Sequence, residues 1–210
     1  MSDDGVLTPA GFASPGRLEL AKALRDLIHV AMTAEPRDDA TLASITAAAR
    51  VATSHLAAGT GEGDHGGRRR RIEHGHDDYK HRSLLLDQTN PIAPGWQWWR
   101  DGDAAVARGS FGAPYEGAEG LVHGGWIALA LDELLGFLNV MHGIVALTGT
   151  LTVSYRAPTK IGAPLEVVAR REQCKGRRVV NRATMTEAGV VTAEAEGIFI
   201  RLPQDQGASP

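Results

Sequence analysis

The feature that most restricts the fold is one long apolar segment, residues 124–141, set among segments with strand-like patterns. It is apolar on nearly every side of a helix, and such a helix has to be buried rather than laid on a solvated edge. Its most apolar part, Trp126 to Met141, is shorter than the roughly 20 residues of a membrane span and contains Asp132 and Glu133. We therefore expect a central core helix and no membrane insertion.

Five segments around this helix have the pattern of strands. One precedes it at residues 103–111, and four follow it at residues 144–155, 165–173, 177–186 and 190–201. In the segment 144–155, apolar residues alternate strictly with Thr148, Thr150, Thr152 and Ser154, which predicts one apolar and one hydroxyl face. Turn signals between the last strands favour hairpins. The order β-α-β-β-β-β predicts an α+β fold, an antiparallel sheet wrapped round the helix.

The chain before residue 84 divides in two by composition. Residues 1–58 carry apolar residues at a three-to-four spacing and predict a helical extension of two helices, separated near Pro36. Residues 59–83 are rich in glycine, charge and histidine, which predicts a flexible charged linker. We place the main domain at residues 84–202 and a C-terminal tail at 203–210.

Composition excludes several classes of function. The 210 residues contain 22 Lys plus Arg and 25 Asp plus Glu, a net charge of −3, so a protein that coats nucleic acid is not expected. The basic run Arg68 to Arg71 lies near acidic residues without interleaved aromatics, and the nearby histidines lack metal-ligand spacing, so we expect neither nucleic acid nor metal nor cofactor. A single cysteine, Cys174, and a start without a secretory pattern favour the cytoplasm.

Residues suited to catalysis lie at the start of the central helix and two turns into it. His123 precedes it, and the backbone N–H of Gly124 in the first turn has no intrahelical partner, so it can donate to an oxygen that gains negative charge. Gly125 lets a substrate approach the backbone. Asp132 lies two turns further on among apolar residues, where an ionisable carboxylate is costly unless it is hydrogen-bonded or borders a cleft. Its neighbour Glu133 lies about 100° round the helix and faces another surface, so we expect a structural role for it.

The string YEGAEGLVHGG, followed after seven residues by Asp132, resembles the PaaI/THEM-like branch of hotdog-fold acyl-CoA thioesterases. The resemblance implies hydrolysis of acyl-CoA, with Asp132 as general base or nucleophile and the Gly124 N–H as oxyanion donor. It also implies that Thr148 hydrogen-bonds the carboxylate or its water, and the YRAP string ending at Pro158 fits the same branch. For His123 two roles stay open, polarising the carbonyl or serving as a hydrogen-bonded structural residue before the helix. Some relatives carry Asn or Gln where this chain has Gly117.

Coenzyme A would bring phosphates, and the segment from Arg156 to Arg182 holds eight basic residues. Among these we expect Arg156, Arg177 and Arg178 to contact the nucleotide end. Trp96, Trp98 and Trp99 are packing anchors or walls of an acyl pocket. The length of the acyl chain is left open.

Gly124 and Asp132 are eight residues apart on one helix, about 12 Å along its axis, so one chain would not supply both to one carbonyl. A homodimer or dimer of dimers with composite sites agrees with the resemblance. Two other readings stay open: a non-catalytic hotdog module that binds acyl-CoA or acyl carrier protein, and a hotdog dehydratase or hydratase.

Overall fold

The computed structural model describes residues 14–35, 38–58 and 83–202. Of the expected linker it describes only Ser83, and the expected tail at 203–210 and Pro36 lie outside the described residues.

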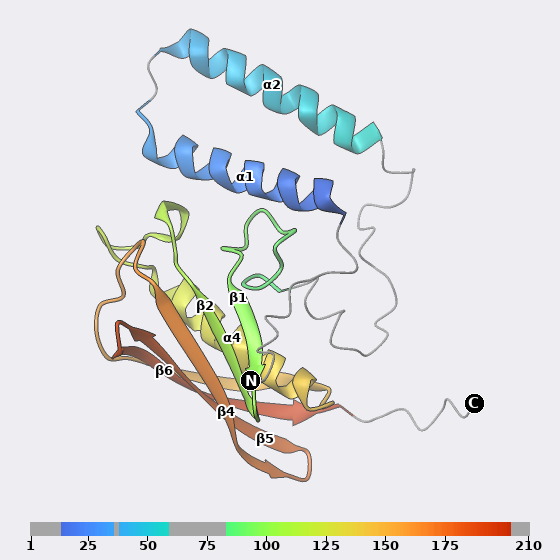
Figure 1. Ribbon diagram of the computed structural model, residues 1–210, viewed down its shortest axis with the longest axis vertical. Helices are drawn as coiled ribbons and strands as arrows, with labels where there is room; N and C mark the ends of the chain where they lie inside the picture. Colours follow the sequence, from blue (N-terminus) through green and yellow to red (C-terminus); the bar gives the residue numbers. More distant parts are fainter. Residues whose placement is uncertain (1–13, 36–37, 59–82, 203–210) are drawn as a thin grey trace, which may run out of the picture.

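The expected antiparallel sheet round a central helix is confirmed (Figure 1). Six strands form one sheet in the order β1-β2-β4-β5-β6-β3: β1 (Gln97–Asp101), β2 (Ala104–Gly109), β3 (Ala146–Tyr155), β4 (Leu165–Lys175), β5 (Arg178–Glu187) and β6 (Val190–Arg201). Every neighbouring pair is antiparallel. Helix α4 (Gly124–Met141) packs against β2 to β6, which is the hotdog arrangement.

Strand β1 is one strand more than the sequence predicted. Its residues include Trp98, whose ring meets Phe137 of α4 edge-on with centroids 4.4 Å apart. Trp96, just before β1, is 1% exposed and donates from Nε1 to the Ser110 carbonyl at 3.1 Å. Both tryptophans are packed in the protein interior. Trp99 instead lies under the guanidinium of Arg108, 5.0 Å from the ring centroid.

The core lies between α4 and the sheet. Leu131, Leu134, Leu135 and Leu138 are fully buried, and burying each such side chain contributes roughly 1.5–3 kcal/mol to folding. By length and composition α4 is also the one helix in the described part of the chain that could cross a membrane. Its burial against five strands accounts for that apolar character, as expected of a core helix.

The predicted helical extension is present as α1 (Pro15–Thr33) and α2 (Asp39–Ala58). Ser14 caps α1 by accepting the Arg17 N–H, and proline occupies the first turn, where it is well tolerated. Arg25 of α1 donates to the carbonyls of Gln88 and Asn90 at 3.0 and 3.1 Å, which ties α1 to the segment before β1. Figure 1 shows α2 beyond α1, farther from the sheet.

Candidate active site

The N-terminus of α4 is built by a short loop that ends at His123. His123 is the N-cap residue, and its Nδ1 accepts the Gly125 N–H at 3.0 Å. Because Nδ1 accepts, the neutral ring carries its proton on Nε2. The loop passes so close that a Cβ on Gly117 would lie 2.8 Å from the His123 Cα. The amide side chain that some relatives carry at this position therefore has no room here.

Gly124 presents its N–H at the start of α4. Among the described residues this N–H meets no hydrogen-bond acceptor, whereas the Gly125 N–H is occupied by His123. The two glycines predicted for the site thus differ, since only Gly124 offers a free backbone donor. An unpaired N–H at the positive end of a helix is suited to stabilising an oxyanion.

Asp132 lies half-buried on α4 and touches the predicted hydroxyl. Thr148 of β3 donates from Oγ1 to the Asp132 Oδ1 at 3.1 Å. Burial raises the pKa of Asp132, and the hydrogen bond from Thr148 opposes that rise. The site therefore holds a carboxylate with a raised pKa, oriented by one donor, which suits a general base or a nucleophile.

A β-bulge in β3 decides which of its side chains face α4. Thr148 pairs with Phe199 of β6 and Thr150 pairs with Ile198, so Gly149 is the extra residue. The side chains that meet α4 or the core are therefore Ala146 and Thr148 before the bulge, and Leu151, Val153 and Tyr155 after it.

The predicted strict alternation in this strand is accordingly wrong at Gly149. Without the bulge, Thr148 and Tyr155 would point to opposite faces, because they are seven residues apart and the period of a strand is two. With it, Thr148 reaches Asp132 and Tyr155 reaches the Gly124 carbonyl, at 2.8 Å from its hydroxyl. Tyr155 is a site residue that the sequence analysis did not single out; its only signal there was the YRAP string.

Glu133 occupies a different environment from Asp132, as predicted. It contacts the Ser83 side chain and the Leu84 backbone, which lie in the segment before β1. Burial raises the pKa of Glu133, those hydrogen bonds lower it and the neighbouring Asp132 raises it further. The contacts fit a role in attaching α4 to that segment.

The basic residues predicted for coenzyme A are not gathered around Asp132. Arg156 forms an ion pair with Glu194 at 2.7 Å, and Arg177 donates from Nε to the Arg201 carbonyl at 3.3 Å. Arg178 is exposed and alternates with buried Val179, so it faces away from α4. Their part in binding remains a prediction.

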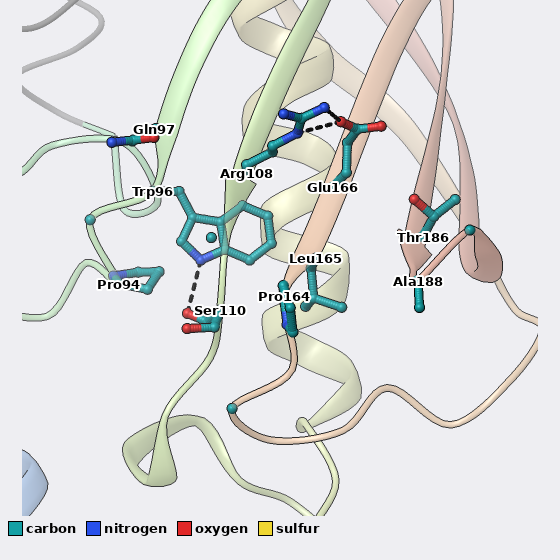
Figure 2. Close-up of a pocket in the computed structure, with 14 residues that line it drawn as sticks. Pro94, Trp96, Gln97, Arg108, Ser110, Pro164, Leu165, Glu166, Thr186 and Ala188 are labelled. Carbon is teal, nitrogen blue, oxygen red and sulfur yellow. Dashed lines mark hydrogen bonds and ion pairs between the residues drawn. The ribbon is translucent and has the colours of Figure 1, made fainter. Parts of the chain in front are cut away.

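A cavity of about 640 Å³ lies on the outer face of the sheet, away from α4 (Figure 2). Trp96, Pro164 and Leu165 line it together with Arg108 and Glu166, which are joined at 2.5 Å. None of the residues predicted for catalysis or for binding coenzyme A lines this cavity, whereas Trp96, predicted as a packing anchor or a wall of an acyl pocket, does. Among the described residues no group of three or more His, Cys, Asp or Glu could hold a metal ion.

Known proteins share this sequence pattern and this fold. Residues 119–194 match the family model of the thioesterase superfamily. A curated relative, acyl-coenzyme A thioesterase THEM4 of Rattus norvegicus, is 29% identical over 97 residues, which cover 45% of this chain and 42% of the relative. The chain therefore spans less than half the length of that relative.

Solved structures share the fold. A thioesterase superfamily protein aligns with a TM-score of 0.81 at 23% identity, covering 93% of this chain and 94% of that chain, so α1 and α2 are included. The E. coli PaaI protein from the phenylacetic acid degradation operon has a TM-score of 0.50 at 18% identity, covering 52% of this chain and 81% of its own. A hypothetical thioesterase of Streptococcus pneumoniae TIGR4, solved with coenzyme A, has a TM-score of 0.50 at 16% identity, covering 52% and 87%. The resemblance inferred from the sequence is confirmed: residues 119–194 are similar to the thioesterase superfamily, and the domain that carries His123 and Asp132 has the hotdog fold.

Proposed function

We propose that the protein hydrolyses the thioester bond of an acyl-CoA to a free acid and coenzyme A. The observation that carries the proposal is the pairing of Asp132 with Thr148 on a helix whose first turn presents the free Gly124 N–H. The name of the THEM4 relative and the coenzyme A in the streptococcal structure support this substrate class.

Each group has a chemical task in this reaction. Ionised Asp132 takes a proton from water as the water attacks the thioester carbon, or it attacks that carbon itself to give an anhydride that water then opens. The carbonyl oxygen becomes an oxyanion that the Gly124 N–H stabilises, an effect commonly worth about 3 kcal/mol per donor. Collapse of the intermediate breaks the carbon–sulfur bond, and the departing thiolate receives a proton.

His123 is placed to add a second donor. Its Nε2–H has no hydrogen-bond partner among the described residues, and His123 directly precedes Gly124 at the start of α4. We assign it the task of polarising the carbonyl. An acid limb in the pH–rate profile would report ionisation of Asp132, whose pKa burial raises.

The proposed site is shared by two chains. Gly124 and Asp132 of one chain are about 12 Å apart along α4, too far for both to reach one carbonyl. In the part of the chain that the structure describes, β3 pairs only with β6, which leaves its other edge available to a second copy, and its Leu147 is 62% exposed. A two-fold dimer through this edge would set Gly124 of one chain opposite Asp132 of its partner.

The activity is tested with a panel of acyl-CoAs of graded chain length, including aromatic acyl groups, by following release of free thiol. Asp132→Asn should remove nearly all turnover, since an amide is neither a base nor a useful nucleophile. Glu133→Gln is the matched control, because it changes the adjacent carboxylate in the same way. Turnover by Asp132→Asn within about tenfold of the wild type would reject the assignment of Asp132.

The shared site is tested by complementation. Asp132→Asn and Gly124→Pro chains, each shown to be dimeric and inactive, are mixed and allowed to exchange subunits. A mixed dimer has one site with both lesions and one intact site, so up to half of the wild-type activity should return. Verified heterodimers that stay inactive would rule out the shared site.

A further inference from the structure

Tyr155 makes an unusual contact with the first turn of α4. Its hydroxyl donates to the Gly124 carbonyl at 2.8 Å. A Cβ on Gly124 would lie 3.2 Å from this hydroxyl oxygen and 3.3 Å from the adjoining ring carbon, so the phenol rests directly on the glycine. Tyr155 is 55% exposed, and this contact is therefore not a by-product of core packing.

The hydrogen bond continues through the peptide group between Gly124 and Gly125. The carbonyl of that group accepts from Tyr155, and its N–H donates to Nδ1 of His123 at 3.0 Å. Hydrogen bonds at the two ends of one peptide polarise each other, so donation by Tyr155 makes the Gly125 N–H a stronger donor. The result is a chain of two hydrogen bonds that runs from the phenol to the imidazole.

This chain determines which ring nitrogen of His123 carries the proton. A strong donor at Nδ1 keeps that nitrogen unprotonated and leaves the proton on Nε2. The backbone of Gly117 limits movement of the ring, since a Cβ there would lie 3.2 Å from the ring carbon Cδ2. The ring is thereby held in one tautomer and one orientation at the start of α4, with its proton on Nε2.

We infer that Tyr155 is a positioning residue that fixes the tautomer and orientation of His123 through the Gly124–Gly125 peptide. This inference rests on the proposed function in so far as the His123 Nε2–H serves the thioester carbonyl. Tyr155 itself touches no reacting atom in this scheme. The β-bulge at Gly149 is needed for this contact, because it places Tyr155 on the same face of β3 as Thr148.

The test is nitrogen NMR of the full chain labelled in histidine, in the wild type and in Tyr155→Phe. The wild type should show His123 with its proton on Nε2 and with Nδ1 in a hydrogen bond. Tyr155→Phe should move the Nδ1 shift toward that of a free acceptor and populate the other tautomer. Fluorotyrosine at position 155, a stronger donor, should move the shift the opposite way and provides a second readout if Tyr155→Phe does not fold.

Tyr115→Phe is the matched control, since the Tyr115 hydroxyl also donates to a backbone carbonyl, that of Ile92, at 3.1 Å. It should leave the His123 signals unchanged. With acyl-CoA as substrate, Tyr155→Phe should lower kcat about threefold to tenfold with KM nearly constant, as loss of one hydrogen bond predicts.

His123 signals that are identical in the wild type and in Tyr155→Phe would overturn the inference. The NMR readout needs no turnover, so it separates this inference from the proposed function. A tautomer response in a chain that hydrolyses no thioester would support the positioning role of Tyr155 and reject the proposed reaction.

Discussion

Replacing Thr148 with valine removes one hydroxyl and keeps the shape of the side chain. The lost hydrogen bond joins Thr148 Oγ1 to Asp132 Oδ1 at 3.1 Å. Hydrogen bonds to charged groups contribute about 1.5–3 kcal/mol, and the exposed position of Thr148 in the single chain favours the lower end of that range. A loss near 1.4 kcal/mol corresponds to a roughly tenfold lower rate.

The pH dependence of the rate provides a second, independent test of the Thr148→Val prediction. The hydrogen bond from Thr148 lowers the pKa of Asp132 against the larger effect of burial. Without it the pKa of Asp132 rises further, so the acid limb of the kcat/KM profile should move to higher pH. The rate deficit of Thr148→Val should therefore be largest on the acid side and smallest well above the limb.

Thr150→Val is the control that tests the bulge itself. Thr150 is exposed on the same strand, and Gly149 between the two threonines places it on the face turned away from α4. Loss of the Thr150 hydroxyl should leave both the rate and the acid limb of the kcat/KM profile unchanged. Equal effects of the two substitutions, or no effect of Thr148→Val, would refute the assigned geometry of β3.

Three further changes test the stability of the domain. Because burial raises the pKa of Asp132 in the folded state, ionisation of this residue at neutral pH opposes folding. Asp132→Asn should therefore raise the thermal midpoint of unfolding at pH 7. Calorimetry should show this gain disappearing as the pH falls below 3.8, the ordinary pKa of an aspartate. Ala188, in the two-residue turn between β5 and β6, has φ +48°, so Ala188→Gly should raise the free energy of unfolding by about 0.5–1 kcal/mol in urea titrations. Gly109→Ala should lower it by about 2–3 kcal/mol, because the new Cβ would clash with the buried Trp96 ring, and a normal urea midpoint for this variant would contradict the packing described for Trp96.

The central helix and the hairpins after it could be predicted from the sequence because their signals are local. An apolar run from Gly124 to Met141, period-two strands and turn residues each specify one element without reference to the rest of the chain. A hydrogen bond from Thr148 to the Asp132 carboxylate or to its water was predicted from the resemblance, and the structure shows the bond to the carboxylate.

Two features escaped prediction because they depend on pairing between distant segments. Strand β1 is five residues long, QWWRD, with polar ends, and it exists because it pairs with β2 and sets Trp98 against Phe137. The bulge in β3 is hidden by the sequence, since Gly149 fits an uninterrupted alternation. Only the register against β6 shows that it is the extra residue.

The position of the bulge also connects the two halves of the proposed site. β3 is an edge strand and at the same time the strand that holds Asp132 through Thr148 and Gly124 through Tyr155. A second copy that paired with its free edge would have to match the extra residue at Gly149, so the register of that pairing would fix the spacing between one chain's Gly124 and its partner's Asp132. For this reason a slip of one residue at the interface would alter catalysis as well as association, and variants of Gly149 should change both together.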